Sequence, residues 1–300
     1  MAPTQTSPTQ PSGTDHRYVL TLGCPDQTGI VSRISRFLAD AGGWITEAAY
    51  HSDDETGWFF TRQAVRADSI DVGADELRDR FAAEVAAELG PETDWRLTDT
   101  RAEKSAVLLV SKDSHCLIDL LGRAYRHELP ATIKAVVGNH PDLADLTERY
   151  GIPFHHVPFP SDRKADAFAE VGRIVDGYRP DAIVLARFMQ ILPPQLCDAW
   201  AGRAINIHHS FLPSFVGARP YHQAFARGVK LIGATCHYVT ADLDAGPIIE
   251  QDVIRVDHGD AVADMVRQGR DIETLVLSRG LRWHLEDRVL VHGRKTVIFS

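Results

Sequence analysis

The sequence predicts an α/β protein in two parts, a small α+β unit followed by a larger doubly wound α/β domain. Between residues 17 and 99 the hydrophobic pattern gives the order strand, helix, strand, strand, helix, strand, which is the order of a ferredoxin-like unit. From residue 106 onward, short apolar strands alternate with amphipathic helices, as in sheets covered on both faces. We therefore expect a tail over 1–16, a first domain over 17–100 and a second over 101–300.

The composition indicates a folded globular chain. Its 300 residues are 44% hydrophobic, and a formal net charge of −9 argues against a general nucleic-acid or membrane-surface binder. No apolar run approaches the roughly 18 residues of a membrane span, and the polar residues 1–16 lack an apolar signal core. We expect a disordered tail and a cytoplasmic protein. The four cysteines form no Cys-x-x-Cys pair, which favours reduced thiols over a zinc site or disulfides.

The elements of the first domain follow from its apolar spacing and its turn residues. Gly42 and Gly43 end the first helix, and the acidic turn 52–57 separates two strand-like runs. Strands are predicted over 18–24, 44–51, 58–65 and 94–99, and helices over 30–41 and 74–89.

The turn Cys24-Pro-Asp-Gln-Thr-Gly29-Ile-Val resembles the opening loop of ACT domains, small modules that bind amino acids and pair with one another. Gly29 would let a ligand approach the helix N-terminus, whose free N–H groups attract a carboxylate. The resemblance implies Asp26, Gly29 and Ile30 as effector contacts, an effector such as glycine or methionine, and a homo-oligomer such as a tetramer. A plain turn without a ligand, in a module that serves only assembly, is the alternative.

The second domain is predicted to be a doubly wound sheet. In such sheets, ligands bind beyond the carboxyl ends of the strands, where Met189 and His208 would lie. Strands are predicted over 106–110, 133–137, 154–157, 182–186, 204–208, 233–239 and 248–256, with a closing hairpin over 289–299. Helices are predicted over 117–127, 143–150, 165–178, 221–227 and 261–285.

Asn206 and His208 form a polar pair at the end of one predicted strand. Because side chains alternate along a strand, both point to the same face, where an amide can bind an oxyanion and an imidazole can move a proton. Asp242 and Asp244, in a turn closed by Gly246-Pro247, are the candidate partners for the imidazole. Any one of these residues is more often structural than catalytic, so the hypothesis rests on the constellation.

The runs Asn206-Ile-His208, Ser210-Phe-Leu-Pro213 and Leu243-Asp-Ala-Gly-Pro247 resemble the signature of folate-dependent formyltransferases, over roughly residues 105–300. The resemblance implies that Asn206, His208 and Asp244, rather than Asp242, act on the formyl group of 10-formyltetrahydrofolate. His237 lies between these runs and would be either structural or a group that orients its neighbours.

The segment 187–192 resembles the folate pocket of that family, although by itself it could be the end of a core strand. The resemblance implies seven substrate contacts, namely Phe188, Met189, Gln190, Ile191, Leu192, Val239 and Thr240.

One loop departs from the glycinamide ribonucleotide transformylases, in which a glycine-rich loop after the first strand holds the phosphate of the acceptor. Here residues 110–117 read Val-Ser-Lys-Asp-Ser-His-Cys-Leu. Side chains at Lys112, Asp113 and His115 would crowd a phosphate, and the charge of Asp113 would repel it. Water is therefore the expected acceptor.

The ACT-like module, the run 208–213 and the run Val216-Gly-Ala-Arg-Pro-Tyr-His222 together resemble the formyltetrahydrofolate deformylase family. The resemblance implies hydrolysis of 10-formyltetrahydrofolate to tetrahydrofolate and formate, which supplies formate, for example to purine synthesis, and balances the one-carbon folate pools. No metal or other cofactor is expected, and no His-Glu-x-x-His or Gly-x-Gly-x-x-Gly motif occurs. The alternatives are formyl transfer to an amine acceptor and a non-catalytic sensor of amino acids or folate.

Overall fold

The computed structural model describes residues 16–214 and 220–300. Most of the predicted tail and residues 216–219 of the run 216–222 lie outside the described residues. The chain divides between Ala102 and Glu103 into two compact units, within the polar stretch that separates the two hydrophobic patterns.

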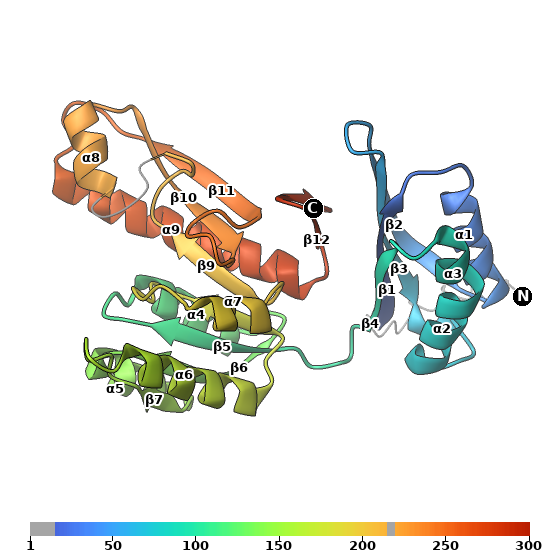
Figure 1. The fold of residues 1–300 in the computed structure, drawn as a ribbon, viewed down its shortest axis with the longest axis horizontal. Coiled ribbons are helices and arrows are strands. Elements are labelled where there is room, and N and C mark those ends of the chain that lie inside the picture. The colour runs from blue at the N-terminus through green and yellow to red at the C-terminus, as the bar shows by residue number, and fades with distance from the viewer. Residues whose placement is uncertain (1–15, 215–219) are drawn as a thin grey trace, which may run out of the picture. The chain divides into compact units, whose positions relative to one another are not determined.

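The first unit is a four-stranded antiparallel sheet with strand order β2-β3-β1-β4, and its helices lie on one face of that sheet (Figure 1). This order agrees with the ferredoxin-like pattern expected from the sequence. The helix predicted over 74–89 is one helical segment with a π turn in its middle. The elements are β1 (Arg17–Pro25), α1 (Ile30–Asp40), β2 (Trp44–Asp53), β3 (Trp58–Arg66), η1 (Ala67–Ser69), α2 (Ala74–Phe81), η2 (Ala82–Ala86), α3 (Ala87–Leu89) and β4 (Asp94–Asp99).

The second unit contains a seven-stranded sheet with strand order β11-β10-β9-β8-β5-β6-β7. The five strands from β9 to β7 are parallel, whereas β10 is antiparallel to both of its neighbours. The strands are β5 (Ser105–Val110), β6 (Thr132–Gly138), β7 (Phe154–His156), β8 (Ala182–Leu185), β9 (Ala204–His208), β10 (Leu231–Tyr238) and β11 (Ile248–Arg255). The chain reverses direction across the sheet between β5 and β8, so the loops after these two strands diverge and leave room for a ligand.

Helices cover both faces of this sheet. Alternate residues of β5 point to opposite faces: Leu108 packs in a cluster with side chains of α4 and α9, while Leu109 packs in one with those of α6 and α7. The elements are α4 (His115–Tyr125), η3 (Pro141–Leu143), α5 (Ala144–Arg149), α6 (Lys164–Tyr178), α7 (Pro194–Ala199), α8 (Pro220–Arg227) and α9 (Val262–Leu285), with the hairpin β12 (Val289–His292) and β13 (Lys295–Ile298). The sequence analysis missed α7, because it begins at the Pro193-Pro194 pair, which is typical of a turn or loop.

In the described ranges, none of the helices, the long α9 included, combines the length and the apolarity that crossing a bilayer requires.

Alanine substitutions at two helical glycines should change the free energy of unfolding in opposite directions. A Cβ added at Gly280 of α9 would lie 2.6 Å from the Sγ of Cys236 on β10, whereas a Cβ at Gly177 of α6 would meet no atom within 4 Å. We expect Gly280→Ala to lower the free energy of unfolding by about 1–3 kcal/mol through overpacking. Gly177→Ala should raise it by about 0.5–1 kcal/mol, because alanine favours the helix. Urea unfolding measures both, and a stabilising Gly280→Ala would contradict the observed packing.

Candidate active site

A cavity of about 670 Å³ opens at the carboxyl ends of the central strands. Its wall is built from the loop after β5, the turn 187–192 after β8, the end of β9, the segment from the end of β10 to Asp244, and side chains of α8 and α9. We call it the active-site cavity. Segments far apart in the sequence meet here because parallel strands end at the same edge of a sheet.

The last residue of β9, His208, is held by a carboxylate from the loop between β10 and β11. Its Nδ1 lies 3.2 Å from Oδ1 of Asp244, and both side chains are largely buried. The hydrogen bond from His208 lowers the pKa of Asp244, so the carboxylate is charged at neutral pH. Gly246 lets this loop close onto β10, since a Cβ there would lie 1.8 Å from the carbonyl oxygen of Tyr238.

The other ring nitrogen of His208, Nε2, is buried without a hydrogen-bond partner among the described residues. Such a group costs roughly 1–3 kcal/mol when it stays unpaired. Because Nδ1 donates to Asp244, Nε2 of the neutral ring carries a lone pair. His208 also lies in the wall of the cavity, which makes Nε2 a base for a proton brought by a ligand or by water.

Asn206 is oriented by His237, which lies directly opposite it in the antiparallel pair of β9 and β10. Nδ1 of His237 lies 2.9 Å from the carbonyl oxygen of Tyr238 and donates to it. Nε2 can then accept from the Asn206 amide, whose Nδ2 is 3.2 Å away. Burial lowers the pKa of His237, which maintains this neutral form. The second N–H of the Asn206 amide is left to donate to an oxygen in the cavity.

All seven residues expected to contact folate lie in the cavity wall. In the turn after β8, Phe188 and Leu192 are buried, whereas Met189 and Ile191 are 57% and 68% exposed. The backbone N–H of Met189 donates to the Ser111 hydroxyl at 3.1 Å, which ties this turn to the loop after β5. The turn therefore presents apolar side chains beside a polar catalytic edge.

Of the three residues expected to contact an effector, Gly29 lines a cavity in the described structure, and Asp26 and Ile30 do not line it. The carboxylate of Asp26 accepts a hydrogen bond from the hydroxyl of Ser52, and the side chain of Ile30 is buried in the core of the first unit. Gly29, with φ of +94°, precedes α1 and lines a separate cavity of about 470 Å³ together with Arg33 and Arg36.

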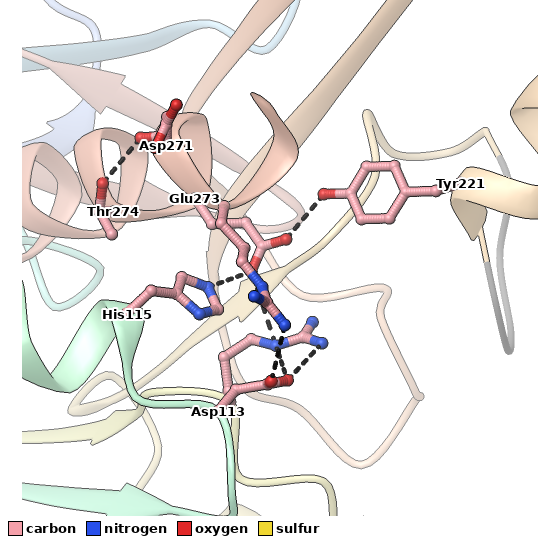
Figure 2. Close-up of polar contacts among 8 residues, drawn as sticks. Asp113, His115, Tyr221, Asp271, Glu273 and Thr274 are labelled. Atoms are coloured by element: carbon pink, nitrogen blue, oxygen red, sulfur yellow. Dashed lines mark hydrogen bonds and ion pairs between the residues drawn. The ribbon is translucent and has the colours of Figure 1, made fainter. Parts of the chain in front are cut away.

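Sequence reasoning missed a buried charged cluster in the cavity wall, and Figure 2 shows part of it. At its centre is Glu273 of α9, which is 1% exposed. Its carboxylate accepts from the Tyr221 hydroxyl at 2.7 Å, lies 2.8 Å from Nε2 of His115 and is 3.5 Å from Nε of Arg187. Burial acts to raise the pKa of Glu273, but the His115 hydrogen bond and the Arg187 charge outweigh it and lower the pKa.

Arg187 and Arg270 both pair with Asp113 of the loop after β5, at 3.1 and 3.4 Å. We call Asp113, His115, Arg187, Tyr221, Arg270 and Glu273 the charged cluster. One feature of the sequence could have indicated this cluster. Glu273 lies next to Ile272 and three residues before Val276, on the apolar face of α9, where a charged residue is unexpected.

Three of the groups here could also ligate a metal. Ligand atoms of His115, Cys116 and Glu273 lie within 4.8 Å of one another, a grouping that the sequence spacing did not suggest. Burial raises the pKa of the Cys116 thiol well above its ordinary value, and the Arg187 guanidinium stands 3.5 Å from the Glu273 carboxylate. Both features oppose a cation, and the described contacts use His115 and Glu273 as a hydrogen-bonded pair instead.

The comparisons with known proteins agree in both sequence and structure. The profile of the formyl transferase family matches residues 104–281. A formyltetrahydrofolate deformylase of Corynebacterium sp. (strain P-1) is 45% identical over 282 residues, which is 94% of this chain and 98% of the relative. The formyltetrahydrofolate deformylase of Bacillus subtilis (strain 168) is 45% identical over 289 residues, 96% of this chain and 95% of the relative.

Among solved structures, a formyltetrahydrofolate deformylase from Pseudomonas syringae pv. tomato is 56% identical with a TM-score of 0.93, covering 96% of each chain. A glycinamide ribonucleotide transformylase 1 from Symbiobacterium toebii is 27% identical with a TM-score of 0.64, and covers 68% of this chain and 98% of its own. The similarity to the first extends over the N-terminal unit as well.

The environment of His209 predicts a pH-dependent stability. Burial and the positive charge of Arg187 lower the pKa of His209 to about 4, whereas in the unfolded chain it is about 6.5. Below pH 6.5 the unfolded state therefore binds a proton that the folded state refuses, so stability falls as the pH decreases from about 6.5 to 4, by about 3 kcal/mol in all. His209→Gln should remove this part of the dependence.

Urea unfolding at pH 7.5, 6 and 5 measures the effect, with His258→Gln, at an exposed histidine of the same unit, as the control. A pH dependence in His209→Gln as steep as that of the unchanged protein would contradict the assignment.

Proposed function

This chain belongs to the formyltetrahydrofolate deformylase family, and we propose that Asn206, His208 and Asp244 carry out its reaction, the hydrolysis of 10-formyltetrahydrofolate to tetrahydrofolate and formate. The observation that carries the assignment is the hydrogen bond that Nδ1 of His208 donates to the Asp244 carboxylate at 3.2 Å, which leaves Nε2 of His208 in the cavity wall without a partner among the described residues. The relatives and solved structures of that name support the reaction itself.

In the proposed mechanism, water attacks the formyl carbon while Nε2 of His208 accepts its proton. The oxygen of the former carbonyl becomes an oxyanion and accepts a hydrogen bond from the Asn206 amide, which His237 holds in place. The charged Asp244 stabilises the imidazolium. When the tetrahedral intermediate collapses, the carbon–nitrogen bond breaks, and the nitrogen leaves with the proton carried by His208. The products are tetrahydrofolate and formic acid, which ionises to formate and a proton.

We propose that the apolar turn after β8 receives the pterin. The exposed side chains of Met189 and Ile191 flank it, and Phe188 and Leu192 support it from the core. Gln190, Val239 and Thr240 lie in the same wall. This division supports the proposal, because it places the flat ring of the substrate between apolar side chains in the same cavity as Asn206 and His208, without occupying those two residues.

Water is favoured as the acceptor because side chains of the loop after β5 are paired with other residues of the protein. Asp113 pairs with Arg187 at 3.1 Å, and His115 binds Glu273 at 2.8 Å, so side chains that belong to the protein take up the place expected for a phosphate cradle. Formyl transfer to a phosphate-bearing amine acceptor would need a glycine-rich loop whose backbone N–H groups hold that phosphate, and residues 110–117 contain no glycine. The proposed steps use side chains of the chain and require no metal.

We further propose that the first unit is an ACT-like module that serves in homo-oligomeric assembly, for example of a tetramer, and binds an amino acid such as glycine or methionine. Its strand order β2-β3-β1-β4 and the cavity beside Gly29 support this proposal. Light scattering measures the subunit number. A response of turnover to glycine or methionine that Gly29→Val removes would support the effector site, and turnover indifferent to both would count against it.

The acceptor is tested by measuring formate from 10-formyltetrahydrofolate with and without glycinamide ribonucleotide. We expect formate release at the same rate in both reactions, because water reaches the formyl carbon unaided. Turnover that requires the ribonucleotide would overturn hydrolysis in favour of transfer, and no turnover in either reaction would favour a sensor.

The role of Asp244 predicts a separation of turnover from affinity. Asp244→Asn keeps the shape of the side chain but removes the charge that stabilises the His208 imidazolium, so turnover should fall by about 100-fold or more. The KM for 10-formyltetrahydrofolate should change by no more than about threefold, since no binding group is lost. Steady-state kinetics measures both. Asp242→Asn is the matched control, because Asp242 lines the same cavity and forms no ion pair with His208 in the described structure.

A further inference from the structure

The charged cluster contains a second buried nitrogen that has no hydrogen-bond partner among residues 16–214 and 220–300, Nη1 of Arg187. The side chain of Arg187 is 12% exposed and lines the active-site cavity. Its Nη2 donates to Oδ2 of Asp113 at 3.1 Å, and its Nε faces Asp113 and Glu273 at 3.4 and 3.5 Å. The guanidinium is therefore fixed in place, with one donor left over in the same cavity wall as Nε2 of His208.

The backbone of Arg187 indicates that its position is imposed by its surroundings. Arg187 follows β8 with φ of +65°, a left-handed conformation that is uncommon for a residue with a side chain. Such conformations persist where the surrounding structure determines them, and they gather at functional sites. A long cation that only neutralised Asp113 could do so from a relaxed backbone.

The charges around Arg187 leave it able to attract an anion. Asp113 is shared with Arg270 of α9, and Glu273 is shared with His115 and Tyr221. Each of the two carboxylates therefore also interacts with a group other than Arg187. Arg187 and Arg270 balance Asp113 and Glu273 in formal charge, so the charged cluster as a whole does not repel an incoming anion.

We propose that Arg187 binds the formate that is released in the cavity, with Nη1 donating to one carboxylate oxygen. This inference rests on the proposed hydrolysis, because formate is its product. Formate suits the position because it is the smallest carboxylate and is formed where the His208 side chain acts. A charge-assisted hydrogen bond satisfies the unpartnered donor better than a neutral acceptor does.

For catalysis, this means that the two products leave the cavity in a fixed order, formate first. Formate moves from Asn206 and His208 to Arg187 while tetrahydrofolate still occupies the apolar turn. Arg270, whose side chain is 52% exposed and which reaches the same Asp113 at 3.4 Å, provides the next positive charge toward solvent. Arg187 is thus a product-binding residue, and the acidic and basic groups around it are positioning residues.

The test measures inhibition of hydrolysis by sodium formate, with sodium acetate and sodium chloride at the same ionic strength as comparisons. In the unchanged protein, formate should inhibit more strongly than either salt. Arg187→Gln and Arg187→Lys should both raise the inhibition constant of formate by at least about tenfold, because each removes the fixed Nη1 donor. Arg187→Lys keeps the positive charge beside Asp113 and Glu273, so it protects the test against misfolding of the glutamine variant.

Arg279→Gln is the matched control. Arg279 also lies on α9 and pairs with Glu250 and Asp252 at 3.0 and 3.5 Å, so its replacement removes one arginine charge from the same unit. We expect the inhibition constant of formate to stay within about twofold in this variant, because the lost charge does not line the active-site cavity in the described structure.

Direct binding separates this inference from the proposed function. Line broadening of ¹³C-formate by the full-length protein, with tetrahydrofolate present, should be lost in Arg187→Lys. A protein that hydrolyses the substrate but shows equal inhibition by formate and acetate, or unchanged formate binding in both Arg187 variants, would overturn the inference and leave hydrolysis standing. Binding of formate through Arg187 in a protein without hydrolysis would instead overturn the proposed function.

Discussion

The rest of the site depends on the hydrogen bond between His208 and Asp244, which joins the end of one strand to the loop between two others. His208 ends β9, whereas Asp244 lies in the loop between β10 and β11 and reaches the ring at 3.2 Å. That loop can close only because Gly246 lacks a Cβ next to the carbonyl of Tyr238. The antiparallel β10 therefore leads directly to the loop that brings the Asp244 carboxylate to the His208 ring, and its His237, opposite Asn206 in the register, orients the Asn206 amide.

In the proposed mechanism, the charged cluster is the reason that water is favoured as the acceptor. A buried carboxylate such as that of Glu273 needs donors and cations around it, and here they come from the loop after β5, from the turn after β8 and from α8. The side chains that meet this need, His115 and Arg187 among them, occupy the place where the related transferases are expected to hold an acceptor. In this proposal, the same side chains stabilise the buried Glu273 carboxylate and leave water as the acceptor.

Most of the architecture could be read from hydrophobic periodicity. The predicted strands and helices correspond to the observed elements within a few residues, because strands such as 106–110 and helices such as α9 carry long, regular patterns. The short α7 was missed because it begins at the Pro193-Pro194 pair, which is typical of a turn or loop. The expected effector contacts stay a prediction: Gly29 lines a cavity beside α1, whereas the side chain of Ile30, at the first position of α1, packs in the core.

The sequence by itself determined the catalytic candidates, because Asn206, His208 and Asp244 stand in short runs whose spacing and neighbours are distinctive. It also indicated the apolar segment 187–192 and the missing glycine-rich loop. Only the tertiary structure decided that His237 orients Asn206 and that Glu273 gathers His115, Arg187 and Tyr221. These contacts join residues that are 31 to 158 positions apart in the sequence. Such pairings follow from strand register and helix packing, which a local sequence pattern does not determine.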